Sequence, residues 1–128
     1  MIDRKLIYKV KSYHGNFLYL NSKDFSLIQS TTYKENFYPI FYYNSFNILV
    51  VQVDDAFYKI HSIDHSCKAN LSHMDKPSLI EIISESKNII SVKMNGEFLS
   101  ARKDSEDKSF LFKSNLNDWE KFERIFSN

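Results

Sequence analysis

The stretch Gly96-Glu97-Phe98-Leu99-Ser100-Ala101 has two counterparts earlier in the chain, Gly15-Asn16-Phe17-Leu18-Tyr19-Leu20 and Asp55-Ala56-Phe57-Tyr58-Lys59-Ile60. In each stretch a turn former stands two residues before a phenylalanine, and a second large residue follows the phenylalanine directly. The phenylalanines stand at positions 17, 57 and 98, so they are 40 and 41 residues apart. Self-similarity at a fixed period is typical of a structural unit that occurs several times, and here it predicts three copies.

A second marker recurs with nearly the same period and consists of two apolar residues three positions apart. The pairs are Phe37 with Ile40, Leu79 with Ile82, and Trp119 with Phe122. Together the two markers divide the chain into repeats over about 5–45, 46–86 and 87–128. No linker rich in Pro, Gly or Ser separates the repeats, and a length of 128 residues is typical of one domain. We therefore predict a single domain over residues 1–128.

Each repeat contains the same order of four strand-like segments, the first two joined by a tight turn. Asn95-Gly96 between two such segments is the strongest hairpin signal of the three turns. The spacing of three inside the fourth segment breaks strand alternation and predicts a bulge there. A helix also fits the spacing at 119–125, but the aromatic and β-branched residues of the counterparts at 37–43 and 79–85 favour a strand. Ser105-Glu106-Asp107-Lys108 is expected to be a loop insertion in repeat three.

Three units of four strands predict an all-β fold with pseudo-three-fold symmetry. A β-propeller typically needs at least about four blades to close, whereas three four-stranded units describe a β-trefoil, with six strands in a barrel and six in a hairpin cap. In a β-trefoil we expect the repeated markers to fill the common core. The predicted core residues are Phe17, Phe57, Phe98, Phe37, Leu79, Trp119 and Phe122.

The third repeat resembles the fascin-like branch of the β-trefoil superfamily. Val92-Lys93-Met94-Asn95-Gly96-Glu97-Phe98-Leu99-Ser100-Ala101, followed by Asp118-Trp119-Glu120-Lys121-Phe122, is similar to that family's G-x-aromatic-L-S-A … W-E-x-F pattern. Repeats one and two keep the apolar frame of this pattern. The resemblance implies the β-trefoil fold; because its motif residues are structural, it does not transfer the actin binding of family members to this chain.

Composition and charge narrow the classes of partner and compartment. The 17 basic and 16 acidic residues give a net charge of +1, so we expect no nucleic-acid partner. No apolar run approaches the ~18 residues of a membrane-spanning helix, and the first residues lack the apolar region of a signal peptide. Cys67 is the single cysteine and cannot form an internal disulfide. These features predict a soluble, cytoplasmic protein without membrane insertion; export by a route that uses no signal peptide is the alternative.

The residues capable of catalysis or metal binding follow no established pattern. His61, His65, Cys67 and His73 have the spacing H-x3-H-x-C-x5-H, which matches no standard zinc site, so we predict no metal and a buried Cys67 thiol. Asp54-Asp55 is better explained as a turn than as an acid–base pair. No G-x-S-x-G, H-E-x-x-H or P-loop motif occurs, so we expect no catalytic residues, no cofactor and no enzymatic activity.

The candidate binding residues are Tyr38, Phe41 and Tyr42. They align with Glu120, Glu123 and Arg124 of repeat three, so the fold does not require aromatic rings there, and exposed rings would suit a protein interface or a sugar. The alternative is that they fill the barrel. We predict a non-enzymatic module that binds another protein, such as an intracellular inhibitor, an immunity-type or a cytoskeleton-associated protein. A carbohydrate-binding, lectin-like trefoil without the ricin Gln-x-Trp motif is the alternative function.

Overall fold

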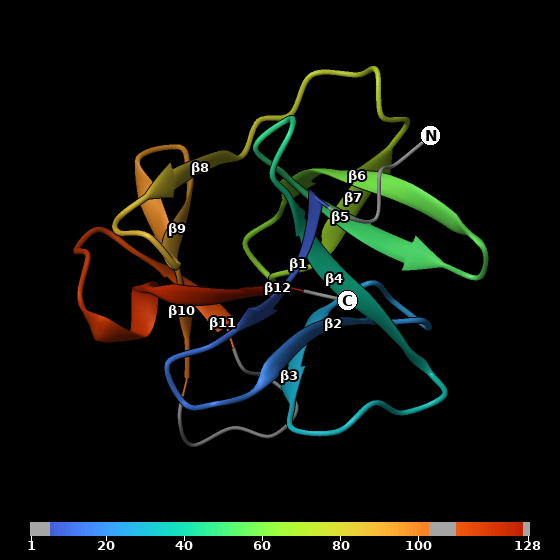
Figure 1. Ribbon diagram of the computed structural model, residues 1–128, viewed down its shortest axis with the longest axis horizontal. Coiled ribbons are helices and arrows are strands. Elements are labelled where there is room, and N and C mark those ends of the chain that lie inside the picture. Colours follow the sequence, from blue (N-terminus) through green and yellow to red (C-terminus); the bar gives the residue numbers. More distant parts are fainter. Residues whose placement is uncertain (1–5, 103–109, 127–128) are drawn as a thin grey trace.

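The computed structural model describes residues 6–102 and 110–126, and this part of the chain is all-β (Figure 1). The strands of the first half are β1 (Ile7–Lys11), β2 (Phe17–Asn21), β3 (Leu27–Ser30), β4 (Phe37–Tyr43), β5 (Ile48–Val53) and β6 (Ala56–Ile63). Those of the second half are β7 (Ala69–Ser72), β8 (Glu81–Ser84), β9 (Ile89–Met94), β10 (Glu97–Ala101), β11 (Phe110–Lys113) and β12 (Phe122–Phe126), with a short 3-10 helix η2 (Asp118–Glu120) before β12. The loop predicted at 105–108 lies outside the described residues. Among the helices of the described part, none is long and apolar enough to cross a membrane.

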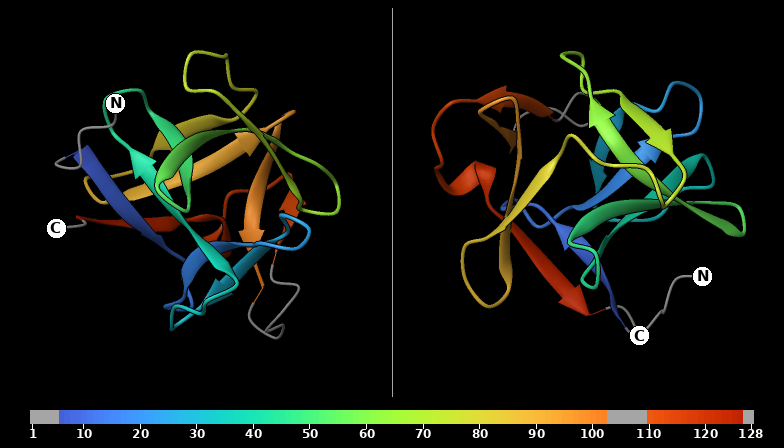
Figure 2. Two further views of the ribbon diagram at one scale, coloured as in Figure 1. Left: turned by 90° about the vertical axis from the view of Figure 1, so that its right-hand side faces the viewer. Right: turned by 90° about the horizontal axis from the view of Figure 1, so that it is seen from above.

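The strands pair antiparallel along the path β11-β10-β9-β12-β1-β2-β4-β5-β6-β7. Strand β3 pairs with β2, β8 pairs with β9, and β1 pairs additionally with β4. The first and last strands are neighbours, with Lys9 opposite Ile125. Figure 2 shows the strands arranged around a common interior, so the two ends of the described chain meet in one sheet.

The hairpin turns form where the sequence predicts them. Met94 pairs with Glu97 across a two-residue turn in which Asn95 and Gly96 both have positive φ, at 53° and 81°. Such a turn matches the twist of the flanking strands, and Asn-Gly is the dipeptide that adopts it most readily. Asp54, with φ at 56°, occupies the equivalent turn between β5 and β6, which confirms the turn interpretation of the Asp54-Asp55 pair.

The residues that follow the marker phenylalanines, and not the phenylalanines themselves, belong to the main core or pack against it. Leu18 and Leu99 are buried completely or nearly so, whereas Phe17 and Phe98 are only half-buried. Phe57 is half-buried as well, so the prediction that these three rings fill the core is wrong. Successive side chains of a strand point to opposite faces of the sheet. The repeat shows which residues occupy equivalent positions, but it does not show whether those positions face the core or the outside.

The outward-facing phenylalanines lie beneath lysine side chains of the facing strand. Lys11 stands opposite Phe17, and its Nζ lies 5.5 Å from the ring centroid. Lys93 stands opposite Phe98 in the same way, at 5.3 Å. An ammonium group over an aromatic face is attracted by the ring, and the lysine stem covers part of the apolar surface. These contacts explain why rings outside the core are only partly exposed.

The second marker is buried in part. Phe122 is completely buried and Phe37 is 8% exposed, which confirms two of the predicted core residues. Leu79 is 62% exposed and Trp119 is half-buried, so these two predictions are wrong. Leu79 precedes β8, and Trp119 lies in η2, before β12 begins at Phe122. The strand predicted at 119–125 is therefore confirmed for 122–125 and wrong for 119–120.

The predicted bulge at the second marker is absent from β4, which pairs in regular register with β1, β2 and β5. Phe37 and Ile40 point to opposite faces of this strand and join different clusters. Ile40 belongs to the main core, whereas Phe37 packs with Tyr19 and Ile28 on the outer side. Other residues cover both faces of β4, so its apolar side chains can be buried on either face and no bulge is needed to bring Phe37 and Ile40 to the same face. A register shift occurs instead in β6, between Ile60 and Ser62.

Arg124 of β12 ties the last strand to two distant turns. Its guanidinium carbon lies 5.4 Å from the ring centroids of both Tyr8 and Tyr42. Its nitrogen atoms donate hydrogen bonds to the carbonyl oxygen of Lys87 and to Oδ1 of Asn44. Arg124 therefore connects β12 to the β4–β5 and β8–β9 turns at one end of the strand assembly.

Candidate functional site

Tyr38, Phe41 and Tyr42 do not form an exposed strip. Phe41 is 8% exposed and Tyr42 is 2% exposed, so the expectation that these two rings are exposed to a partner is wrong, and Tyr38 is half-buried. The alignment with repeat three is misleading because Glu120, the counterpart of Tyr38, is itself 3% exposed. A charged residue at the equivalent position is no proof of exposure when its carboxylate is satisfied by hydrogen bonds.

The hydroxyl of Tyr42 belongs to a partly buried hydrogen-bond relay. It donates to Oδ1 of Asn47 at 2.5 Å, and Nδ2 of Asn47 donates to the carbonyl oxygen of Ile82 at 2.9 Å. Burial raises the pKa of Tyr42, so the hydroxyl remains a donor at neutral pH. Asn47 holds φ at 54°, a region that asparagine tolerates better than most residues. The relay fixes the β4–β5 turn against β8.

A surface that the sequence did not single out lies on the outer side of repeat one. Tyr19, Ile28 and Phe37 form an apolar cluster separate from the main core, and Phe17 packs against it. Tyr33, in the loop between β3 and β4, is 64% exposed, and its ring centroid lies 6.3 Å from that of Tyr19.

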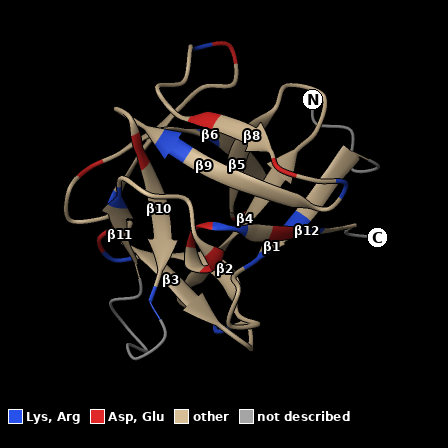
Figure 3. Ribbon diagram, turned by 90° about the vertical axis from the view of Figure 1, so that its left-hand side faces the viewer, with Lys and Arg blue, Asp and Glu red and all other residues tan. Residues whose placement is uncertain are grey.

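Three lysines surround this cluster. The Nζ atoms of Lys9 and Lys11 each lie 5.5 Å from the centroid of the Phe17 ring, and Nζ of Lys34 lies 5.6 Å from that of Phe37. We call the surface the repeat-one face; its members are Lys9, Lys11, Phe17, Tyr33, Lys34 and the cluster Tyr19, Ile28 and Phe37. On the side of the molecule drawn in Figure 3, basic and acidic residues are interspersed along the strands.

The repeat-one face continues into a shallow groove of about 300 Å³ along β4. Pro39 pairs with Tyr19 of β2, whereas the pairing of β4 with β5 begins only at Ile40. One edge of β4 is therefore open at Pro39, the residue that has no N–H to leave unpaired. The groove is lined by Tyr33, Glu35, Phe37, Tyr38, Pro39, Gln52 and Asp54. Of the three predicted binding residues, Tyr38 alone lines this groove.

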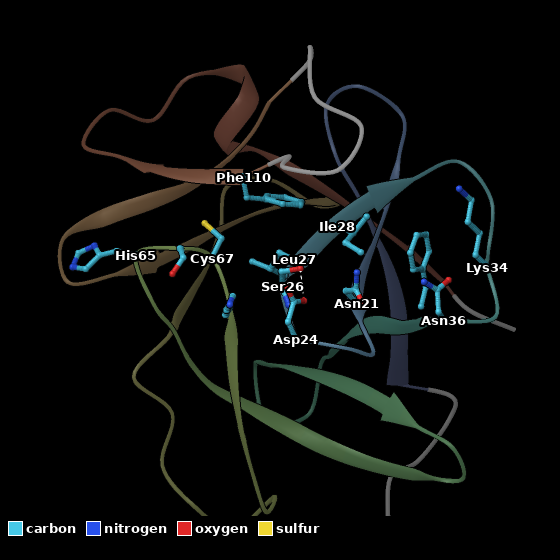
Figure 4. A pocket seen from close by; sticks show the side chains of 13 residues that line it. Asn21, Asp24, Ser26, Leu27, Ile28, Lys34, Asn36, His65, Cys67 and Phe110 are labelled. Carbon is cyan, nitrogen blue, oxygen red and sulfur yellow. Dashed lines mark hydrogen bonds between the residues drawn. The ribbon is translucent and has the colours of Figure 1, made fainter.

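A larger groove of about 790 Å³ lies between the β2–β3 and β6–β7 turns (Figure 4). Figure 4 shows His65 and Cys67 on one side, Lys34 and Asn36 on the other, and Asp24 with Ser26 between them. Leu27 N–H donates to the carbonyl oxygen of Cys67 and Ala69 N–H to that of Phe25, both at 2.8 Å. These reciprocal bonds join the two turns.

Each of the two turns is stabilised by an aspartate. Oδ1 of Asp24 accepts hydrogen bonds from the backbone N–H and the hydroxyl of Ser26, which lower the pKa of Asp24. Oδ1 of Asp64 accepts from the N–H groups of Ser66 and Lys68, and the bond from Lys68 is the main cause of the lowered pKa of Asp64. Both aspartates are exposed, and their hydrogen bonds serve the turns.

The histidines and the cysteine of repeat two are not grouped as metal ligands in the described part of the chain, although His65 and Cys67 line the same groove. His61 Nδ1 donates to the carbonyl oxygen of Pro77 at 2.7 Å, and His65 and His73 are exposed. Cys67 is 5% exposed, which confirms its predicted burial, although it lies in the turn before β7 and not in a strand. Within residues 6–102 and 110–126, no three His, Cys, Asp or Glu side chains are grouped as metal ligands.

The Cys67 thiol is expected to react slowly in the folded protein. Burial, followed by the charge of Asp64, raises its pKa from 9.0 to about 11. At pH 8 the folded chain should therefore contain about a hundredfold less thiolate than the unfolded chain, and thiolate is the reactive species. The rate with a disulfide reagent should rise at least that much in urea; equal rates would contradict the burial. The thiol's contribution to stability should be present below about pH 9 and lost as the pH rises towards 11.

A third hollow, of about 260 Å³, lies beside the single tryptophan. It is lined by Lys113, Asn117, Asp118, Trp119 and Glu120. The Trp119 ring meets His14 edge-on, with centroids 5.0 Å apart, and His14 in turn meets Tyr13 at 5.7 Å. The sequence predicted Trp119 in the core. Because Trp119 lies in η2 and not in a strand, its ring is only half-buried and lies next to His14.

Comparison with models of known protein families and with curated proteins finds no match for the chain.

Proposed function

We propose that the all-β chain is a β-trefoil, related to the fascin-like branch that repeat three resembles. The pairs β1–β4, β4–β5, β8–β9, β9–β12 and β12–β1 connect six strands in a path that ends at β5 and β8. Asn47, directly before β5, bridges to Ile82 of β8 through its side chain. The pairs β2–β3, β6–β7 and β10–β11 supply three hairpins. This arrangement supports a six-stranded barrel with a hairpin cap.

We infer that the protein is a non-enzymatic module that binds another protein through the repeat-one face. The observation behind this proposal is Tyr33, a 64% exposed tyrosine on an apolar cluster that lies outside the main core. Tyrosine supplies a large contact area with few rotatable bonds and is enriched among residues that dominate binding energy. The surrounding lysines supply a polar rim, as protein interfaces usually have.

The test compares two single substitutions of equally exposed aromatic residues. Tyr33→Ala removes the centre of the repeat-one face, whereas Phe46→Ala removes a 60% exposed ring beside Tyr43 at another turn. A partner captured by the unmodified chain from its native host should bind Tyr33→Ala at least about tenfold more weakly, a loss of about 1.4 kcal/mol. Affinity should be measured by calorimetry with purified components.

Phe46→Ala should retain the affinity of the unmodified chain. Thermal unfolding of both variants shows whether they remain folded, and both changes lie at exposed positions where large stability effects are unusual. A partner whose affinity is unchanged by Tyr33→Ala and reduced by Phe46→Ala would place the interface elsewhere and overturn the proposal.

A further inference from the structure

The hollow beside Trp119 is held rigid by a buried carboxylate. Glu120 is 3% exposed; its Oε2 accepts the hydroxyl of Ser100 at 2.5 Å, and its Oε1 accepts the N–H of Asn117 at 2.8 Å. These two bonds anchor η2 to β10 and to the residue before η2. The short helix that presents Trp119 is therefore positioned by the protein itself and requires no ligand to order it.

The aromatic neighbour of Trp119 is fixed as well. Nε2 of His14 lies 3.0 Å from the carbonyl oxygen of Ala101 and must donate a proton to it, because a carbonyl only accepts. His14 then meets the indole edge-on at an interplanar angle of 74°. A binding surface whose side chains are already ordered loses less entropy when a ligand arrives.

We propose that this hollow, the Trp119 hollow, binds one neutral pyranose ring of a carbohydrate. Its volume of about 260 Å³ is below the ~300–1,000 Å³ of sites for drug-sized ligands and suits a single sugar ring. The indole of Trp119 offers an apolar surface to the C–H groups of such a ring. The carboxylate of Asp118, the amide of Asn117 and the ammonium of Lys113 offer hydrogen-bond partners for its hydroxyls.

The charges at the rim favour a neutral ligand over an ion. Lys113 and Asp118 are both exposed and carry opposite charges, and the Glu120 carboxylate, which also lines the hollow, already accepts hydrogen bonds from Ser100 and Asn117. An anion would be repelled by the two carboxylates, and a cation would be repelled by Lys113. The Trp119 hollow is formed by β11 and η2 and shares no residue with the repeat-one face, so it stands apart from the proposed protein binding.

The single tryptophan makes the test direct, because all tryptophan emission comes from the hollow. The full chain is titrated with methyl β-galactopyranoside, methyl α-glucopyranoside and methyl α-mannopyranoside, and with glycerol as the non-ring control. At least one pyranoside should change the emission saturably with a Kd of about 1–10 mM, an affinity expected of one small ligand in an open site. Glycerol should produce no saturable change.

Two variants decide whether the signal comes from the proposed contacts. Asp118→Ala, at an exposed position, should weaken binding at least about tenfold, while Tyr33→Ala should leave it unchanged. Absence of a saturable change with all three pyranosides would overturn the proposal, and so would full binding by Asp118→Ala. Because Tyr33→Ala is the variant that tests protein binding, each proposal can fail without the other.

Discussion

Replacing Phe122 by alanine is expected to lower the free energy of unfolding by about 3–5 kcal/mol. Phe122 is completely buried at the start of β12, and its ring stacks on that of Phe110 with centroids 6.4 Å apart. Truncation removes the apolar area and leaves a cavity that the surrounding strands cannot fill, because protein interiors are close-packed. Denaturation in urea, followed by circular dichroism, measures the change.

A matched control for Phe122 lies in the same strand. Phe126 is 48% exposed, and its ring meets Tyr8 edge-on at the surface. Phe126→Ala should lower the free energy of unfolding by no more than about 1.5 kcal/mol, the upper range of an aromatic pair without full burial. If the two alanine variants were equally stable, the assignment of Phe122 to the core would be incorrect.

Tyr42→Ala is expected to destabilise the fold by about 3–5 kcal/mol, as truncation of a buried aromatic residue does. Tyr42 is 2% exposed, so this variant should lose stability and not a contact with a partner. Tyr42→Phe keeps the ring and removes only the hydroxyl, which donates a hydrogen bond to Oδ1 of Asn47. It should cost about 0.5–1.5 kcal/mol, the net contribution of one hydrogen bond, because Asn47 is exposed and water can replace the lost donor. Thermal and urea unfolding of both variants provide the measurement.

The result that would restore Tyr42 to a binding surface is equally clear. A Tyr42→Ala chain that unfolds within about 1 kcal/mol of the unmodified protein, while its affinity for a captured partner falls at least about thirtyfold, would show an exposed interface residue. Equal stability of Tyr42→Phe and the unmodified chain would show that the bond to Asn47 contributes nothing.

The strands and turns were predictable because their signals are local. The Asn95-Gly96 turn and the apolar segments beside it follow from φ preferences and side-chain period alone. Which face of a strand is buried depends on the partners that cover it, and here β4 is covered on both sides. The repeat therefore predicted correctly that Phe17 and Phe98 lie in strands, but it did not predict that their rings lie on the outer face of the sheet.

The candidate sites were harder to predict because they depend on contacts between distant segments. The Trp119 hollow needs Glu120 to be buried against Ser100, twenty residues earlier in the chain. Ser100 lies in the repeated stretch Gly96–Ala101 and Glu120 lies between the second-marker residues Trp119 and Phe122, so a polar residue inside each marker was the available signal. Tyr33 had no such signal, because a tyrosine in a polar loop becomes a surface feature only when the loop folds over Tyr19.

The pairing of β1 with β12 has a consequence for synthesis on the ribosome. Residues 7–11 are made early, but one edge of their strand acquires its partner only when residues 122–126 have left the exit tunnel. Until then the nascent chain exposes an unpaired strand edge, a known template for association with other chains. Folding dominated by such distant pairs is also slow. We expect this domain to complete its fold only after residues 122–126 have emerged from the ribosome, and to be prone to association with other chains until then.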